Sequence, residues 1–167
     1  MKNMMYILAG IIFVLFSIFI IGTFLPKTRE LTKQTIYDAS PETVYNIVIN
    51  NQDWRYRSSL DDLKIIETNG EFEIWDEISE GITIRFKTKE KIPFTFYSFD
   101  MNSLFFQGEW FAEFKTIENG KTCFTATERI SYKNPFIRVF GYVFMNLNKY
   151  METYQDELRD KVEEVCS

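Results

Sequence analysis

The sequence contains no histidine. This absence removes the side chain most often used for proton transfer near neutral pH, and it also removes the commonest metal ligand. The two cysteines, Cys123 and Cys166, are too few for a zinc site, and neither has a histidine to activate its thiol. We therefore expect no metal, no cofactor and no serine–histidine or cysteine–histidine relay, and we favour two free thiols over a disulfide.

Glycine and basic residues are also scarce. The seven glycines are scattered and form no phosphate-binding loop. Beyond the first 25 residues, 24 acidic residues outnumber 18 basic residues, which gives a net charge of −6. Because a nucleic-acid partner requires a basic face that neutralises its phosphates, we expect no such partner. The composition indicates nothing about protein partners.

An uncharged apolar run opens the chain. Residues 4–25 contain only Ser17 and Thr23 as clearly polar side chains. As a helix, this run would be about 33 Å long, enough to cross a hydrocarbon core of roughly 30 Å. The run is longer than the apolar core of a signal peptide, and it ends in the bulky Phe24-Leu25-Pro26 rather than in small residues. We therefore predict an uncleaved single-pass membrane anchor.

The predicted anchor divides the chain into three parts. Three basic residues closely follow the apolar run and one precedes it, a balance that favours the cytoplasmic side for the rest of the chain. The predicted parts are a transmembrane anchor at residues 1–26, a linker at residues 27–30 and a single domain at residues 31–167.

Period-two alternation of apolar and polar residues runs through most of the domain. Ser40-Pro41-Glu42 has a capping residue, a proline and an acid in the order typical of a helix start. Asn69-Gly70 between two alternating runs indicates a β-hairpin. We expect strands over residues 31–37, 63–66, 72–75, 82–87, 94–100, 104–116 and 122–132.

The carboxyl-terminal part has helical periodicity. Asn134-Pro135 again places a capping residue before a proline, and apolar residues then recur at helical spacing from Ile137 to Val165. This pattern predicts one amphipathic helix of about eight turns. The order of elements predicts an α+β fold in which a curved antiparallel sheet wraps around a long C-terminal helix.

Several short strings in this order resemble the START-like helix-grip superfamily, in particular its polyketide cyclase/dehydrase and lipid-transport (SRPBCC) group. The resemblance covers about residues 31–165. It implies a cavity between sheet and helix that holds a hydrophobic ligand, but it transfers no catalytic residue. The matching strings are Ala39-Ser40-Pro41-Glu42-Thr43-Val44-Tyr45, Asn51-Gln52-Asp53-Trp54, Gly108-Glu109-Trp110, Asn119-Gly120-Lys121-Thr122 and Asn134-Pro135.

Large apolar side chains fall in the phase that would face the helix. They either fill a plain core or line a ligand cavity, and the resemblance favours the cavity. The expected lining residues are Ile74, Ile82, Ile84, Phe86, Phe106, Trp110, Phe114, Phe124, Phe144, Leu147 and Met151.

Two carboxylates share that phase. Asp76 follows Ile74 in alternation, and Glu128 follows Phe124. If these carboxylates face inward, either one could bind the polar end of a ligand or act as an acid or base. The alternative is that both lie near strand ends, where side chains reach water.

These features lead to one functional hypothesis and two alternatives. The hypothesis is a membrane-anchored, non-catalytic domain that binds an apolar small molecule, such as a lipid or isoprenoid, close to the bilayer. The first alternative is an enzyme of the cyclase or hydratase kind that uses Asp76 or Glu128. The second is an interaction module with a filled core. Residues 136–145, which are apolar on nearly all sides, either pack in the core or contact the bilayer beside the cavity mouth.

Overall fold

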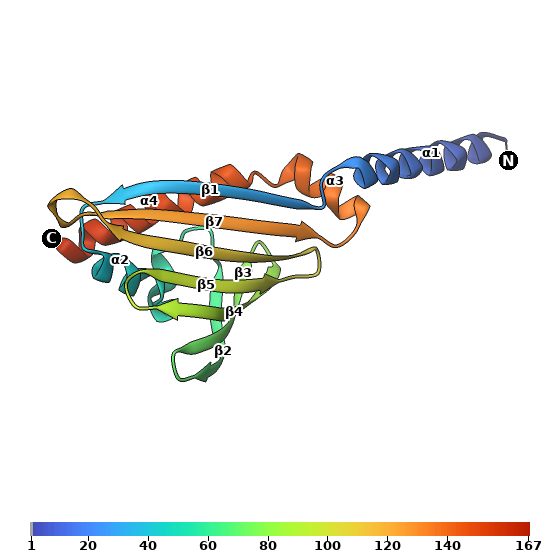
Figure 1. Cartoon of the computed structure of the whole chain (residues 1–167). Helices are drawn as coiled ribbons and strands as arrows, with labels where there is room; N and C mark the ends of the chain where they lie inside the picture. Colours follow the sequence, from blue (N-terminus) through green and yellow to red (C-terminus); the bar gives the residue numbers. More distant parts are fainter. Residues whose placement is uncertain (1) are drawn as a thin grey trace.

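A single seven-stranded antiparallel sheet dominates the computed structural model, which describes residues 2–167 (Figure 1). The strands are ordered β1-β7-β6-β5-β4-β3-β2, so each strand after β2 pairs with the one before it, and β1 joins the sheet beside β7. The strands are β1 (Thr28–Tyr37), β2 (Asp62–Asn69), β3 (Phe72–Ser79), β4 (Ile82–Ile92), β5 (Phe96–Asn102), β6 (Phe106–Thr116) and β7 (Thr122–Tyr132).

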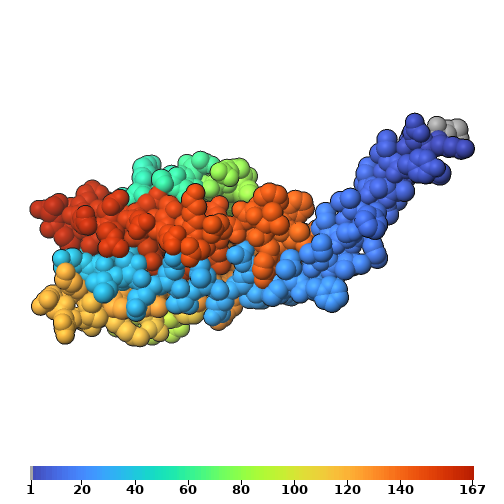
Figure 2. All heavy atoms as spheres, turned by 90° about the horizontal axis from the view of Figure 1, so that it is seen from above, coloured from blue at the N-terminus to red at the C-terminus, as the bar shows by residue number. Residues whose placement is uncertain are grey.

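Helices lie on one side of this sheet and at one end of it. The longest helix of the domain, α4, runs along the sheet and contacts β1 (Figures 1 and 2). The sheet and this helix confirm the predicted α+β helix-grip architecture. The helices are α1 (Lys2–Phe24), α2 (Pro41–Val48), α3 (Pro135–Phe144) and α4 (Leu147–Cys166), with short 3₁₀ helices η1 (Asn51–Tyr56) and η2 (Glu118–Gly120).

Helix α1 projects away from the rest of the molecule (Figure 2). It is long and apolar enough to cross a membrane, and its apolar side chains are largely exposed. Its carboxyl-terminal end lies beside α3.

The predicted caps and turns form where the sequence indicates them. The Ser40 hydroxyl accepts a hydrogen bond from the Thr43 backbone N–H at the start of α2. Gly70 has a φ of 62° in the turn between β2 and β3, a conformation that glycine adopts without steric cost. Two register shifts, one in β2 between Ile65 and Glu67 and one in β4 between Thr88 and Glu90, mark bulges that bend these strands.

The predicted single C-terminal helix is wrong, because the chain forms two helices there. Met145 adopts an extended conformation (φ −93°, ψ 105°), which ends α3. The Asn146 side chain then accepts a hydrogen bond from the Lys149 N–H and starts α4. Apolar periodicity continues across this break, which is why the pattern alone predicted one helix.

The predicted phase of β3 is also wrong by one residue. Trp75 and Glu77 are buried on the inner face, which we define as the face toward α4, whereas Ile74 and Asp76 lie on the outer face. Trp75 stacks on Phe86 of β4, with ring centroids 5.3 Å apart. Burying this large indole decides the register of the strand, because a shift by one residue would expose it.

Candidate functional site

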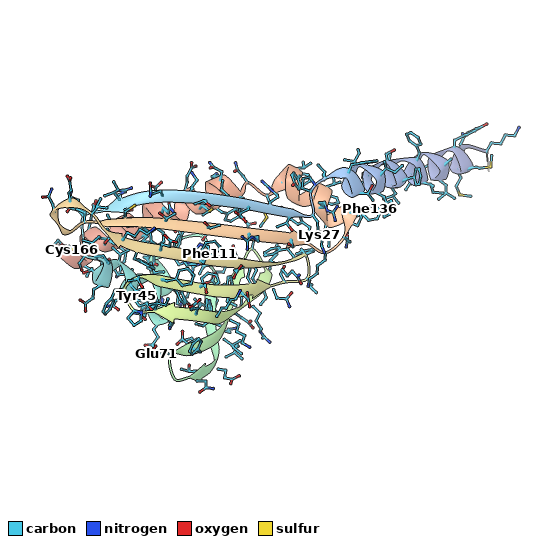
Figure 3. All side chains as sticks on the ribbon, viewed as in Figure 1. Lys27, Tyr45, Glu71, Phe111, Phe136 and Cys166 are labelled. Atoms are coloured by element: carbon cyan, nitrogen blue, oxygen red, sulfur yellow. The ribbon has the colours of Figure 1, made fainter. Side chains whose placement is uncertain are left out.

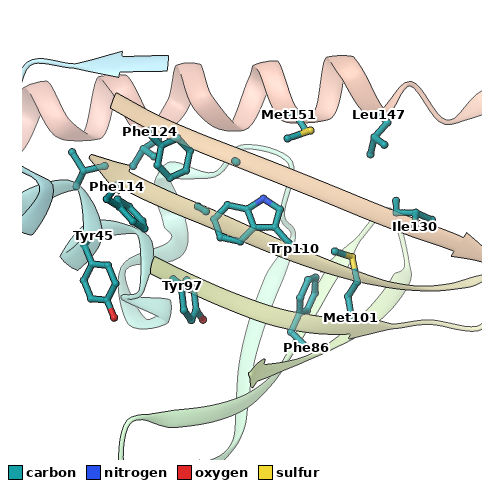
Figure 4. Close-up of a cluster of buried hydrophobic side chains, with 14 of the residues drawn as sticks. Tyr45, Phe86, Tyr97, Met101, Trp110, Phe114, Phe124, Ile130, Leu147 and Met151 are labelled. Atoms are coloured by element: carbon teal, nitrogen blue, oxygen red, sulfur yellow. The ribbon is translucent and has the colours of Figure 1, made fainter. Parts of the chain in front are cut away.

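The inner face of the sheet does not pack fully against the helices. It leaves a cavity of about 580 Å³, bounded by η1, the strands β3 to β7, α3 and α4. All three tryptophans of the chain, Trp54, Trp75 and Trp110, line this cavity. Its walls are mostly aromatic and aliphatic, which suits an apolar ligand. Figure 3 shows the side chains on the ribbon, and Figure 4 shows a cluster of the buried ones, among them Trp110 of the sheet and Met151 of α4.

Most of the apolar side chains expected at the cavity line it, and three do not. Ile74 lies on the outer face. Phe114 and Phe124 are buried but belong to the packed part of the core, where their rings are 5.2 Å apart and Phe114 meets Tyr45 of α2. The expected residues that do line the cavity are Ile82, Ile84, Phe86, Phe106, Trp110, Phe144, Leu147 and Met151.

Asp76 does not reach the cavity. Its two carboxylate oxygens accept hydrogen bonds from Nε and Nη2 of Arg85 on β4, each at 2.7 Å. These bonds lower the pKa of Asp76, so the group is a carboxylate at neutral pH. Its place on the outer face removes it as a candidate for acid–base work on a bound ligand.

Glu77, which the sequence pattern did not single out, lies in the cavity wall instead. Its carboxylate makes a two-pronged pair with Arg57, with nitrogen–oxygen distances of 2.7 and 2.8 Å, and it also accepts a hydrogen bond of 3.0 Å from the Trp75 indole. Burial opposes the charge of Arg57, but the Glu77 carboxylate outweighs this effect and raises the pKa of the guanidinium. The pair is therefore a fixed polar point in an apolar wall.

Glu128 on β7 is the second carboxylate of the cavity. Its neighbours across the strands are Trp110 and Leu31. Within residues 2–167, no side chain or backbone N–H forms a hydrogen bond or ion pair with its carboxylate. Burial, reinforced by the charge of Glu77, raises the pKa of Glu128 to about 7. This residue can therefore hold or release a proton near neutral pH.

Tyrosine hydroxyls supply further polar groups around the cavity. Tyr56 and Tyr154 both line it, and burial raises the pKa of each hydroxyl. The ring of Tyr154 also stacks under Arg57, whose guanidinium carbon lies 5.6 Å from the ring centroid. These groups remain protonated, so they offer hydrogen bonds to a ligand without adding charge.

Exposed aromatic residues surround the mouth of the cavity. Phe105 in the turn between β5 and β6, Phe140 and Phe144 on α3, and Tyr150 on α4 line the cavity and are also exposed to the exterior. The mouth is therefore apolar on the side where α3 meets the sheet.

Comparisons with known proteins identify the fold. No protein-family model matches the chain, and no curated protein matches it by sequence. Among solved structures, the Zhui aromatase/cyclase from Streptomyces sp. R1128 superposes with a TM-score of 0.72 at 9% identity, covering 84% of this chain and 96% of that chain. A norcoclaurine synthase point mutant from Thalictrum flavum, in complex with a transition-state analogue, gives a TM-score of 0.66 at 11% identity, covering 84% and 97%.

A START superfamily protein from Mycobacterium smegmatis is also similar, with a TM-score of 0.65 at 13% identity over 81% of this chain and 98% of that chain. These likenesses extend over nearly the whole length of each relative. They confirm the predicted fold: this chain has a helix-grip fold like that of these proteins, with an additional apolar helix at its amino terminus.

Proposed function

We propose that the protein binds an apolar small molecule, such as a lipid or isoprenoid, in the cavity between sheet and helices, and that it does so as a membrane-anchored, non-catalytic domain. The observation that carries this proposal is the cavity itself. A volume of about 580 Å³ lies within the range of small-molecule sites, and its walls are mostly apolar. The same void counts against an interaction module with a filled core.

The anchored location rests on α1. In this proposal, residues 1–26 span the membrane, residues 27–30 link them to the domain at residues 31–167, and the excess of basic residues after the span favours the cytoplasmic side. An anchor keeps the cavity where apolar molecules partition, which raises the local concentration of the ligand.

Native mass spectrometry of the full chain, released from detergent micelles containing oleate, tests ligand binding. We expect a one-to-one adduct with the unaltered chain. Ala126, on β7, has its side chain at the cavity wall, so Ala126→Phe fills the space and should weaken the adduct at least tenfold. The absence of any adduct with the unaltered chain would overturn the proposal.

A matched control separates the cavity from other apolar surfaces. Thr125 precedes Ala126 and lies on the outer face, where its hydroxyl accepts a hydrogen bond from Gln34. Thr125→Phe introduces the same ring without entering the cavity and should retain the adduct. Equal adducts for Ala126→Phe and Thr125→Phe would show that oleate binds elsewhere, for example along α1.

Glu128 favours one alternative function, which is acid–base catalysis on the bound molecule. A cavity carboxyl with a pKa of about 7 can, as the carboxylate, take a proton from a ligand C–H bond acidified by an adjacent carbonyl group, exchange it with solvent and return one to the same carbon. In D₂O, this exchange would replace the C–H bond by a C–D bond without an added cofactor.

Mass spectrometry of a lipid extract from the expressing cells, incubated with the full chain in D₂O, tests this alternative. Incorporation of deuterium into one lipid species, lost in Glu128→Gln and retained in Asp76→Asn, would establish the enzyme. Unlabelled lipids would leave the binding function and remove proton-transfer catalysis of this kind.

A further inference from the structure

Helix α3 presents an apolar stripe to the exterior. Phe136, Phe140, Val143 and Phe144 follow the i, i+4, i+7, i+8 spacing of one helical face, and Val143 and Phe144 are 66% and 75% exposed. The Phe140 and Phe144 rings stack with centroids 5.8 Å apart. The water-exposed surface of a protein rarely carries such large apolar side chains together on one helix face. This stripe therefore indicates that another molecule or a membrane covers it.

The turn between β5 and β6 extends the stripe. Leu104 is 83% exposed and Phe105 is 42% exposed. The backbone N–H of Lys133 donates a hydrogen bond of 3.1 Å to the Phe105 carbonyl, which holds this turn beside the start of α3. We call the combined surface the apolar rim; it consists of Leu104, Phe105, Phe136, Phe140, Val143 and Phe144.

The side of α3 that carries Arg138 contacts the end of α1. The Arg138 guanidinium donates hydrogen bonds to the carbonyls of Gly22 (2.8 Å) and Leu25 (3.0 Å), a favourable place for a cation because helix carbonyls point out of the carboxyl-terminal end. Gly22 permits this approach, since a Cβ atom there would overlap the backbone of Pro135.

A second set of contacts tightens the same joint. Arg29, just after the apolar helix, donates hydrogen bonds of 3.1 Å to the carbonyls of Gly141 and Met145 at the end of α3, and it lies over the Tyr142 ring. The Tyr142 hydroxyl donates a bond of 3.3 Å to the Pro26 carbonyl. The anchor is therefore continuous with α3 rather than a loose tether.

These contacts set the depth of the apolar rim. Phe136 packs on Phe19, with ring centroids 5.8 Å apart, and Phe19 lies five residues before the end of α1. At 1.5 Å per residue, the start of α3 reaches about 7.5 Å below the end of α1, the depth at which amphipathic helices lie in a bilayer. Figure 3 shows Phe136 and Lys27 at this joint.

We propose that the apolar rim is embedded in the acyl layer of the membrane that α1 spans, so that the cavity opens into the bilayer and exchanges its ligand there. This inference rests on the proposed anchoring and ligand binding. Phe105, Phe140 and Phe144 belong both to the rim and to the cavity lining, so the embedded surface is the mouth itself. The exposed Lys27 and Lys133 flank it and suit lipid phosphates.

Labelled variants of the full chain in phosphatidylcholine vesicles test the proposal. Cys123 and Cys166 are first changed to serine, so that a single new cysteine can be labelled. Leu104→Cys and Val143→Cys then each carry the environment-sensitive NBD fluorophore. Neither residue lines the cavity. We expect blue-shifted emission and at least twofold quenching by doxyl-labelled phosphatidylcholine. Phe72→Cys, at the exposed hairpin between β2 and β3, is the matched control and should emit as in water.

Each other outcome contradicts the proposal in a recognisable way. Emission typical of water at positions 104 and 143 would mean that the domain is held away from the bilayer. A blue shift without doxyl quenching would mean that a second copy of the chain covers the rim. In either case, a retained oleate adduct in native mass spectrometry would leave the ligand-binding function standing, while its loss would remove that function as well.

Discussion

Asp76 and Glu77 are neighbours in the sequence with opposite environments. Asp76 pairs with the exposed Arg85 on the outer face, whereas Glu77 pairs with Arg57 in the cavity wall. Alternation predicts that adjacent strand residues face opposite sides, but it does not say which side is inner. The burial of Trp75, which is a tertiary effect, decides which residues of β3 face inward. The sequence pattern therefore placed Asp76 in the cavity instead of Glu77.

We expect the two pairs to differ strongly in their effect on stability. Glu77→Gln leaves a buried guanidinium without its counter-charge and should lower the free energy of unfolding by about 3 kcal/mol. Asp76→Asn, the matched control, breaks a solvent-screened pair and should cost less than about 1 kcal/mol. Chemical denaturation of the full chain in detergent measures both, and equal losses would contradict this assignment.

Glu128 was found from the sequence because Phe124 and Ala126 set the phase of its strand correctly. Its carboxyl, with the pKa raised from an ordinary value of 4.5 to about 7, keeps a proton that the unfolded chain releases between these two values. Stability should therefore fall as pH rises through this window and then remain constant above it.

Glu128→Gln should remove this pH dependence. Below pH 4.5 the carboxyl is neutral in both states, so the variant gains nothing there, whereas above pH 7 it should be more stable than the unaltered chain by up to about 3 kcal/mol. Thermal unfolding at pH 4.5 and pH 8 measures the difference, with the exposed Glu67→Gln as control. An equal effect of Glu128→Gln at both pH values would contradict a buried, protonated Glu128.

At the scale of helices and strands, features specified by neighbouring residues were predicted better than features that depend on distant contacts. The Ser40 and Asn134 caps and the Asn69-Gly70 turn are each specified by neighbouring residues, and all formed as expected. The break at Met145 depends on the Asn146 cap, whose signal is hidden by continuing apolar periodicity. The joint between α1 and α3 connects residues more than a hundred positions apart and leaves no periodic signal in the sequence.

Gly22 should be essential for that joint. Gly22→Leu places a side chain where α1 contacts Pro135 and should detach α3 from α1. A spin-label distance between Phe13→Cys on α1 and Lys115→Cys on β6, measured in the cysteine-free background, should change from a narrow to a broad distribution. Gly10→Leu adds the same side chain where no neighbour lies within 4 Å and should leave the narrow distribution. A narrow distribution in both variants would contradict the role of Gly22, and a broad distribution in the unaltered chain would contradict a fixed joint.

At the scale of the whole molecule, the fold follows from the order of the elements, but the cavity does not. Outside β3, the sequence pattern predicts which side chains of the sheet face inward, yet it does not show whether they meet. Phe114 and Phe124 pack against each other, while Trp110 and Met151 line the cavity. That difference depends on how the sheet, η1, α3 and α4 pack around the cavity that they border, which is a matter of tertiary contacts rather than of local pattern.

The central claim, that this space receives an apolar ligand, is tested most directly by tryptophan quenching. All three tryptophans line the cavity and none lies in α1, so a brominated fatty acid quenches them only from within or beside the cavity. Titration of the full chain in detergent with 9,10-dibromostearate should quench most of the tryptophan emission. At saturation, Ala126→Phe should show less quenching than the unaltered chain, whereas Thr125→Phe should show the same quenching. Unquenched emission in the unaltered chain would contradict the account.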